Sequence, residues 1–507
     1  MSRRRHVLQA ALAGACVPGV LTGREAQAAA RPADFAAAAA KDPLLTPLRG
    51  VTDSTGDRDA EAQLLGRWPT ELRGRFYRNG PALYERADQR YHHWFDGDGM
   101  VQQYRMGGGR VVHRGRLVRT AKLRQEQEAG RFVVNALGTS FPGQPPASGP
   151  DSFNTANTNA IEHAGRVLAL WEGGSAYALR TEDLSTQGPV TWGRDLAQMP
   201  FSAHPKIDAQ GQLWNVGAAG RKLVLWHIDA AGSLVKVKAV DSPFAGGMVH
   251  DMAVTARYVV IPLPPVRLDF SAPTSGGRRR FPVAAGEPLR VLVCDKHDFS
   301  ALRVFELPPQ ILFHIANAHE SAEGDIVLSY VGAPDAWFLD EGAVALMSGQ
   351  PTRSSTSDGF VARLNLRTGQ ARVDALPGSD RGVEFPRIHP ARVGELARWT
   401  VSGAAWTGGS RRDHSLFHGL QLLDNVSGRV RRYDYGEQAI VEEHVFVPKP
   451  GGRGELDAWL LGTTFDARRQ ATVLNLIDAA HIEDGPVAQA VLPYWLPLGF
   501  HGNFQAA

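Results

Sequence analysis

Residues 211–240 read GQLWNVGAAGRKLVLWHIDAAGSLVKVKAV and decide the fold class of this chain. The segment holds strand-like runs rich in Leu, Val and Trp, and glycine-containing turns separate these runs. Short apolar runs bounded by such turns are typical of antiparallel strands joined by tight connections. The segment therefore predicts one compact antiparallel unit.

The same pattern returns along the chain at residues 165–184, 258–307, 360–376 and 417–435. Units that recur at roughly 40–50 residues are typical of the blades of a β-propeller. A large β-sandwich or tandem β domains is the alternative, but the regular spacing and the lack of a Pro/Ser-rich linker favour a propeller. Residues 121–160 are polar and rich in Gly and Pro, so we expect a loop there.

The composition fits a large globular β protein. Of the 507 residues 43% are apolar, and 54 Gly and 32 Pro suit many turns and short strands. The net charge of +3 equals the contribution of residues 1–28, which carry four Arg and one Glu. The remainder is near neutral, which argues against a nucleic-acid partner.

The N-terminus has the form of an export signal. Three arginines at 3–5 precede an apolar stretch at 7–21, and Ala26-Gln27-Ala28 is a small-residue cleavage site. We expect residues 1–28 to be removed and the mature protein to be periplasmic. Arg4-Arg5 favours the twin-arginine route, and an ordinary Sec signal is the alternative.

The mature chain is expected to comprise an N-terminal arm at 29–48 and a single domain at 49–507. Cys294 is the only cysteine beyond the signal, so an intrachain disulfide is excluded. The domain must therefore be held together by its core.

Four histidines lie in short apolar runs far apart in the sequence: His204, His250, His314 and His501. A single histidine in such a run is more often a core residue than a ligand. Four that converge would form an all-nitrogen metal site, and imidazole suits Zn, Cu, Fe and Ni alike.

Three glutamates lie in similar apolar settings: Glu172, Glu384 and Glu443. Burial of a lone carboxylate is costly, and a metal-ligating histidine usually donates its other ring N–H to a carboxylate, a carbonyl or water. Each glutamate could thus orient a ligand, and the alternative for each is a position facing solvent.

Residues 76–101, FYRNGPALYERADQRYHHWFDGDGMV, resemble the N-terminal signature of the carotenoid cleavage oxygenases. Further motifs of that family follow in order: SAHPKID, MVHDMAV, FHIANAHE, EFPRIHP, EEHVFVPKPG and the terminal GFHGNF. The resemblance covers residues 44–504.

The resemblance implies an all-β fold, a seven-bladed β-propeller with loops and short helices capping its top face. It implies one ferrous ion per chain, held on the propeller axis by His204, His250, His314 and His501. Glu172, Glu384 and Glu443 would orient three of these histidines. Glu172 is placed only by its preceding strand and its distance from His204, and Glu442 competes with Glu443.

The implied reaction is cleavage of a conjugated carbon–carbon double bond by O2 to give two carbonyl products. Stilbene-cleaving relatives bind a phenol through a Tyr and a Lys, whereas this chain has no Lys between Lys122 and Lys206. We therefore expect an apolar carotenoid or apocarotenoid substrate. A stilbene- or phenylpropene-cleaving enzyme is the alternative, a non-catalytic binding propeller is a third reading, and docking on a membrane surface stays open.

Two departures from the family pattern fall near these motifs. His319 stands where the family usually has an aromatic residue, and Asn503-Phe504 follow the last His-Gly pair where Thr-Trp is frequent. Neither is one of the predicted ligands, so the departures leave the predicted iron site intact and bear on the identity of the substrate.

Overall fold

The computed structural model describes residues 32–507 except 142, 145–146, 245, 268–280, 284–285, 354–355, 377–381 and 407–415. The predicted export signal at 1–28 lies outside the described residues. Within them, no helix has the length and apolar character needed to cross a membrane.

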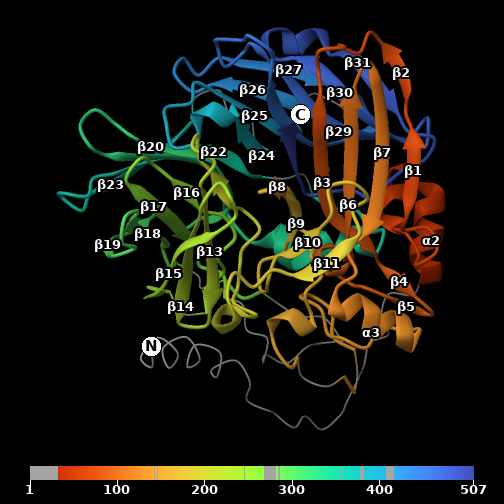
Figure 1. Cartoon of the computed structure of the whole chain (residues 1–507), viewed down its shortest axis with the longest axis horizontal. Helices are drawn as coiled ribbons and strands as arrows, with labels where there is room; N and C mark the ends of the chain where they lie inside the picture. Colours follow the sequence, from red (N-terminus) through yellow and green to blue (C-terminus); the bar gives the residue numbers. More distant parts are fainter. Residues whose placement is uncertain are drawn as a thin grey trace.

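The described strands form seven antiparallel sheets of four or five strands, which are the blades of a β-propeller, and one small hairpin. Figure 1 shows the blades following one another around the molecule in chain order, from yellow through green to blue. The predicted unit at 211–240 is β13, β14 and β15 of one blade, with Val216 opposite Leu225. The propeller predicted from the repeating pattern is confirmed.

Five blades are built from consecutive strands. In each blade the strands are given from the axis outward. The first blade is β8 (Asn159–His163), β9 (Arg166–Leu170), β10 (Tyr177–Leu179) and β11 (Thr186–Pro189), and the second is β12 (Lys206–Ile207), β13 (Leu213–Ala219), β14 (Lys222–Ile228) and β15 (Leu234–Asp241). The third is β16 (Ala253–Val254), β17 (Tyr258–Leu263), β18 (Leu289–Asp295) and β19 (Ala301–Leu307), the fourth is β20 (Ile311–Glu320), β21 (Ile326–Ala333), β22 (Asp358–Leu364) and β23 (Ala371–Ala375), and the fifth is β24 (Val383–Ile388), β25 (Trp399–Ala404), β26 (Gly419–Asp424) and β27 (Val430–Asp434).

The other two blades close the ring with strands from both ends of the chain. One runs β32 (His501–Ala506), β3 (Gly74–Leu83), β6 (Asp98–Gly107), β7 (Arg110–Leu117) and β1 (Arg58–Glu61); the other runs β28 (Ala439–Pro448), β29 (Ala458–Asp466), β30 (Ala471–Asp478), β31 (Pro486–Val491) and β2 (Gln63–Gly66). The C-terminal strand β32 is thus innermost, whereas β1 and β2 add to two outer edges. A ring closed at both its inner and outer edges ties β1 and β2 from the N-terminal part of the described chain, and β32 from its C-terminal end, to the core.

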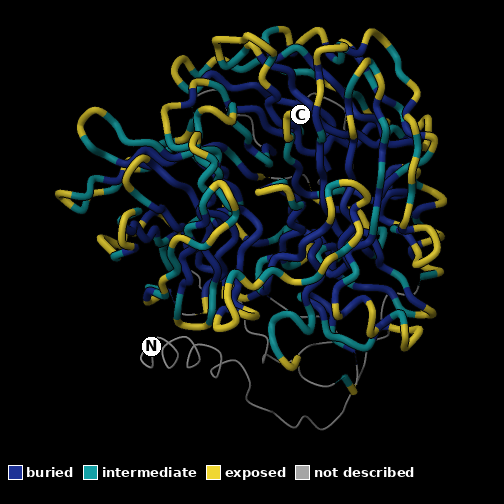
Figure 2. The backbone as a smooth tube through the Cα atoms, viewed as in Figure 1, coloured by how far each residue is buried: buried dark blue, intermediate teal, exposed yellow. Residues whose placement is uncertain are grey.

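The innermost strands contact one another around the axis. Strand β32 touches β8 and β28, β24 touches β20 and β28, and β16 touches β20. Figure 2 shows that the buried backbone lies toward the interior while exposed segments are mainly peripheral turns. Residues at the start of an inner strand are therefore brought together even when they are far apart in sequence.

Short helical segments pack over the ring. The helices are α2 (Pro32–Lys41), α3 (Ala121–Ala129) and α4 (Ala343–Met347), the π-helical turn is η5 (Phe338–Gly342), and the 3-10 turns are η1 (Pro43–Arg49), η2 (Trp94–Asp96), η3 (Pro150–Ser152), η4 (Arg194–Leu196), η6 (Pro390–Arg392) and η7 (Ala479–Asp484). Phe35 of α2, Leu48 of η1, Trp94 of η2 and Leu346 of α4 share one apolar cluster with Phe500. The N-terminal arm is thus helical from residue 32 and buried against the segment that precedes β32. The hairpin β4 (Glu85–Arg86) and β5 (Gln89–Arg90) lies between β3 and η2 in the sequence.

Helix α3 corrects the prediction of a loop over 121–160. Thr120 caps the helix by accepting a hydrogen bond from Leu123 N at 3.1 Å, and Gly130 ends it with φ 64°. The sequence AKLRQEQEA consists of strong helix formers between a good N-cap and a glycine stop. The signal for this helix was present in the sequence.

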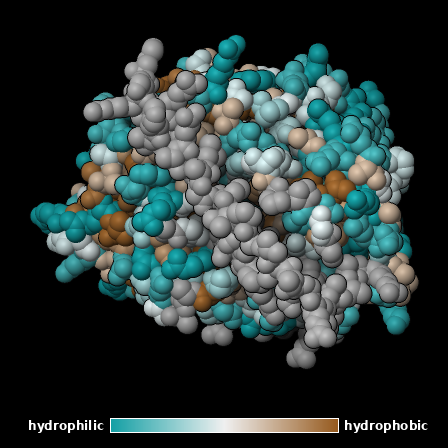
Figure 3. Space-filling model, turned by 90° about the horizontal axis from the view of Figure 1, so that it is seen from below, coloured by the Kyte–Doolittle hydropathy of each residue, from teal (hydrophilic) through white to brown (hydrophobic). Residues whose placement is uncertain are grey.

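The described surface is largely hydrophilic. On the face drawn in Figure 3, hydrophilic side chains surround small separate groups of apolar ones. The large apolar side chains that are exposed, such as Val426, Leu396 and Val235, belong to different blades or connections. Apolar burial is therefore concentrated between the blades and beneath the helical segments.

Candidate metal centre

The four predicted histidines meet at the propeller axis. His204 and His250 lie just before β12 and β16, His314 is in β20, and His501 begins β32. Their side chains each offer one ring nitrogen, and these nitrogens all lie within 4.8 Å of one another. Each histidine is at most 9% exposed. Four blades thus contribute one imidazole each to a buried cluster.

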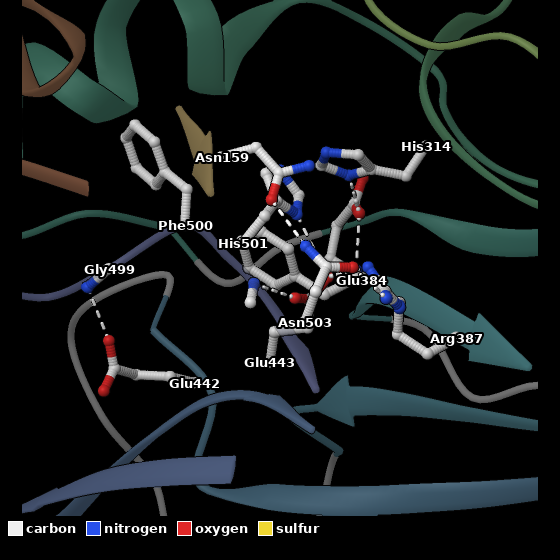
Figure 4. A network of polar contacts seen from close by, with 12 residues as sticks. Asn159, His314, Glu384, Arg387, Glu442, Glu443, Gly499, Phe500, His501 and Asn503 are labelled. Atoms are coloured by element: carbon white, nitrogen blue, oxygen red, sulfur yellow. Dashed lines mark hydrogen bonds and ion pairs between the residues drawn. The ribbon is translucent and has the colours of Figure 1, made fainter. Parts of the chain in front are cut away.

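Three of the histidines have a carboxylate behind them. His314 Nδ1 lies 2.5 Å from Glu384 Oε2, and His501 Nδ1 lies 3.0 Å from Glu443 Oε1 (Figure 4). His250 Nδ1 contacts Glu172 in the same way. A carboxylate that accepts the Nδ1 proton leaves the lone pair of Nε2 free for a metal. All three predicted glutamates therefore lie where they can fix the orientation of a ligand.

The Nε2 atoms face the centre of the cluster. His250 Nε2 and His314 Nε2 are 3.0 Å apart. Buried His204 Nε2 has no hydrogen-bond partner among the described residues. An ion bound about 2 Å from each nitrogen would separate neighbouring nitrogens by about 3 Å and would give His204 Nε2 the partner that it lacks. The cluster consequently fits a single metal ion.

The electrostatics favour neutral imidazoles beside charged carboxylates. Burial and the neighbouring histidines hold the pKa of His204 well below its usual range, and burial lowers the pKa of His501 to about 4 against the opposing charge of Glu443. Burial alone would raise the pKa of Glu443, but Arg387 and His501 outweigh it and lower that pKa to about 2. Metal ligation requires a neutral imidazole, so these two histidines are ready to bind.

His314 differs from these two. Burial acts to lower its pKa, but the charge and hydrogen bond of Glu384 prevail, and the pKa is raised. The same Glu384 oxygen accepts a hydrogen bond from Phe385 N at 2.7 Å. Glu384 is thus held by the backbone on one side and by the imidazole on the other.

Glu442 and Glu443 have separate partners. Glu442 Oε1 lies 3.1 Å from Arg78 Nε and accepts a hydrogen bond from Gly499 N at 2.5 Å. Glu443 accepts from His501 and, through its second oxygen, from Gly502 N at 2.7 Å. Successive residues of a strand point to opposite faces, although a register irregularity lies here between Val441 and His444. Of these two neighbouring glutamates, only Glu443 contacts a histidine of the cluster.

Sequence reasoning missed the polar groups that follow the histidines. Asp251 Oδ1 lies 2.8 Å from Lys206 Nζ, and Asp251 Oδ2 accepts a hydrogen bond from Ile315 N at 2.8 Å. Asp251 is 3% exposed and directly follows His250 in the apolar run MVHDMAV. The sequence signal for this residue was an aspartate within an apolar run, directly after His250. A buried carboxylate requires a partner, so the run predicts a polar contact for Asp251.

His92 and His93, which precede Trp94 in the motif HHWFDGDGM, take no part in the cluster. His93 is buried and accepts a hydrogen bond from Phe95 N at 3.1 Å through Nδ1, while its Nε2 lies 2.7 Å from Leu339 O. These contacts join η2 to η5. His93 therefore organises the covering segments.

A family model identifies the family of the chain. The model described as retinal pigment epithelial membrane protein matches residues 51–506. The chain belongs to this family, the carotenoid cleavage oxygenases. Like other carotenoid cleavage oxygenases it is an oxygenase, and the family uses O2 to cleave carotenoid double bonds.

Individual members of the family are similar over nearly their whole length. Apocarotenoid-15,15'-oxygenase of Synechocystis is 30% identical over 87% of this chain and 91% of its own. Lignostilbene-alpha,beta-dioxygenase isozyme III of Sphingomonas paucimobilis is 27% identical over 92% of this chain and 96% of its own. The structure of cobalt-substituted Synechocystis apocarotenoid oxygenase superposes with a TM-score of 0.80 at 26% identity and covers 92% of this chain and 99% of that one.

Proposed function

We propose that this carotenoid cleavage oxygenase is an Fe(II)-dependent dioxygenase that splits one conjugated double bond of a carotenoid or apocarotenoid. The balanced reaction is R–CH=CH–R′ + O2 → R–CHO + R′–CHO, in which both oxygen atoms enter the products. The observation that carries the proposal is the cluster of four imidazoles, three of them backed by a glutamate.

The donor set supports iron, one ion per chain. His204, His250, His314 and His501 would hold it, and imidazole donors suit ferrous iron. Bound Fe(II) supplies the activation of O2. Glu172, Glu384 and Glu443 keep three rings in the orientation that points Nε2 inward. Burial of the rings excludes bulk water from the centre.

Aromatic side chains on one side of the cluster support an apolar substrate. Phe500, which precedes His501, packs edge-on against Trp94 at 5.0 Å and Phe95 at 5.1 Å between ring centroids. Phe313 precedes His314, and its ring lies 5.2 Å from that of His250. Phe95 and Phe313 are only partly buried, so they remain able to contact a conjugated chain.

Lys122 bears on the choice between carotenoids and stilbenes. Its Nζ lies 2.9 Å from Asp98 Oδ1 and 2.8 Å from Glu126 Oε2, and all three side chains are 0% exposed. This ammonium is used inside the fold and is not available to anchor a phenol. Together with the absence of lysine from 123–205, the buried triad favours the apolar class.

Stilbene cleavage remains the second candidate, because relatives named for lignostilbene and resveratrol are similar over most of the chain. A non-catalytic binding propeller is disfavoured by the three glutamates, since they serve no purpose in a protein that holds no metal.

The cellular setting is also part of the proposal. The basic segment, the short apolar stretch and the A-x-A site support export to the periplasm, with the arginine pair favouring the twin-arginine route. A substrate of this class partitions into lipid, so we propose that the enzyme collects it at a membrane surface. No nucleic acid is expected as a partner, because the chain without residues 1–28 is near neutral.

A turnover assay tests the function. Iron-loaded protein is offered apocarotenals, carotenoids and hydroxystilbenes in air and without oxygen, and carbonyl products are identified by mass spectrometry. We expect two carbonyl products from the carotenoid class in air alone. Turnover restricted to hydroxystilbenes would replace the substrate class, and no O2 uptake with any substrate by iron-loaded protein would overturn the oxygenase assignment for this chain.

A further inference from the structure

Two sets of polar contacts, one on each side of His204 in the chain, link the inner strands just beyond the histidines. We call the two sets together the axial belt and define it by Asn159, Ala203, Lys206, Asp251, Ile315, Arg387, Glu443 and Asn503. Each member lies on or beside an innermost strand, and together they represent all seven blades. Figure 4 shows the part of the belt formed by Asn159, Arg387, Glu443 and Asn503.

Asn503 occupies the centre of one half of the belt. Its Oδ1 accepts a hydrogen bond from Arg387 Nη2 at 2.9 Å, and its Nδ2 donates to Asn159 Oδ1 at 2.9 Å and to Ala160 O at 3.0 Å. Arg387 Nη1 in turn lies 3.5 Å from Glu443 Oε1, the oxygen that holds His501. Asn503 therefore joins the support of His501 to strand β8.

The path continues from β8 to His204. Asn159 is 4% exposed and donates through Nδ2 to Ala203 O at 2.7 Å. Ala203 directly precedes His204, whose ring lies 4.4 Å from that of His501 between centroids. The carbonyl of Ala203 is thus fixed by an amide whose own orientation is set by Asn503.

The other half of the belt fixes the opposite flank of His204. Lys206 Nζ pairs with Asp251 Oδ1 at 2.8 Å, and Asp251 Oδ2 accepts from Ile315 N. Lys206, Asp251 and Ile315 follow His204, His250 and His314 by one or two residues. His204 is consequently held through the backbone on both sides.

No carboxylate contact to His204 is found among the described residues, in contrast to the other three histidines. We propose that Asn503 is a positioning residue for His204, which acts by locking Asn159 onto the carbonyl of Ala203. The inference rests on the proposed function, in which the four histidines hold one metal ion.

The inference also gives a role to a position where this chain has Asn in place of the Thr that is frequent in the family. A single hydroxyl group cannot accept a hydrogen bond from Arg387 and donate two toward β8.

Cobalt(II) binding by metal-free protein tests this role without turnover. Asn503→Asp keeps the size of the side chain and its acceptor for Arg387, but removes the donor that faces Asn159. We expect cobalt affinity to fall about 10-fold, within the range for groups that support a metal ligand, and the cobalt absorption spectrum to change. Asn159→Ser removes the next contact, the hydrogen bond from Asn159 to the carbonyl of Ala203, and should give a similar loss of cobalt affinity. In the double variant the two losses should not add, because both interrupt one path.

Asn475→Ala supplies the matched control. Asn475 is a 0% exposed asparagine in β30 that donates to Thr464 Oγ1 at 3.0 Å, remote from the axis. This variant should lower the thermal midpoint while leaving the cobalt affinity and spectrum unchanged, as expected of a purely structural asparagine. Measuring two belt variants keeps the test valid if one of them does not fold.

The outcomes separate the inference from the function on which it rests. If the wild-type protein binds no cobalt, the proposed metal site fails and the role of Asn503 fails with it. If the wild type binds cobalt and both belt variants bind it with the same affinity and spectrum, the positioning role is overturned while the metal site stands.

Discussion

Glu443 Oε1 lies 3.0 Å from His501 Nδ1, although the two residues belong to different blades and are separated by 58 positions in the sequence. The contact exists because β28 and β32 are neighbouring innermost strands. The same relationship joins Glu384 of β24 to His314 of β20. In these two pairs the carboxylate and the imidazole thus come from adjacent blades, so the spacing of the blades sets the orientation of the ring.

Removal of one ligand should empty the centre. Wild-type protein is expected to bind about one iron per chain, as one four-imidazole cluster allows. His250→Ala should retain little iron in metal analysis, because the remaining three nitrogens leave one side open. His163→Ala is the control, since His163 Nε2 contacts Gly211 O at 3.1 Å and lies outside the cluster. Near-full iron in His250→Ala would remove this residue from the ligand set.

Neutralising a supporting carboxylate should weaken the site without abolishing the fold. Glu384→Gln removes the charge that accepts the proton of His314 Nδ1, and we expect a loss of about 10–100-fold in metal affinity or activity. Metal titration of the purified variant measures the effect. Glu320→Gln is the control: this glutamate lies on β20, the strand of His314, and pairs with Arg257, so the variant should bind metal normally. Equal metal affinity in the two variants would show that Glu384 does not support His314 as a metal ligand.

The buried triad of Lys122, Asp98 and Glu126 should matter for stability. Lys122→Met leaves two carboxylates at 0% exposure without their cation, and removal of one partner of a buried pair costs about 3–5 kcal/mol. Urea unfolding of metal-free protein is the measurement. Arg110→Ala, which breaks an exposed pair with Glu61, should leave the unfolding midpoint nearly unchanged. A similarly small shift for Lys122→Met would mean that Asp98 and Glu126 find other partners.

His113 should make the stability depend on pH. Burial lowers its pKa to about 3, and its ring is satisfied as the neutral form by Tyr494 Oη at 2.9 Å and Gln102 Oε1 at 2.8 Å. The unfolded chain protonates this residue near pH 6.5, so between pH 6.5 and 3 the unfolded state binds more protons than the native state. The contribution of His113 to the free energy of unfolding is therefore complete above pH 6.5. It declines by about 1.4 kcal/mol per pH unit as the pH falls from 6.5 toward 3.

Replacement of His113 isolates this contribution. His113→Gln should lose less stability than the wild type between pH 6.5 and pH 5, by about 2 kcal/mol over that interval, when urea unfolding is measured at both values. The control is His481→Gln, which replaces an exposed histidine and leaves the contacts of His113 with Tyr494 and Gln102 in place. An unchanged slope in His113→Gln would show that the residue titrates normally in the native protein.

Export should depend on the arginine pair. Replacing Arg4-Arg5 with Lys-Lys is expected to leave the precursor in the cytoplasm, whereas the wild-type chain should appear in the periplasm with its N-terminus near Ala29. Cell fractionation and N-terminal sequencing provide the measurement. Normal export of the lysine variant would assign the signal to the Sec route.

Local features of the sequence were sufficient to predict the fold class and the members of the histidine cluster. Glycine turns between short apolar runs are local features, and they specified the strands of units such as β13–β15. Motifs around His204, His250, His314 and His501 predicted the four histidines that meet at the axis, and each of them lies on or within a few residues of its own inner strand. The caps of α3, Thr120 and Gly130, are local features of the same kind.

The pairings of side chains across the axis depend on the tertiary structure. Glu172 contacts His250, Glu384 contacts His314 and Glu443 contacts His501. The chain on either side of His204 is held instead by the Asn159 side chain on the carbonyl of Ala203 and by the ion pair of Lys206 with Asp251. The physical reason is that side chains meet there only after seven blades have closed into a ring. Which residues face one another depends on the register of strands and the position of every blade, and no local pattern encodes either quantity.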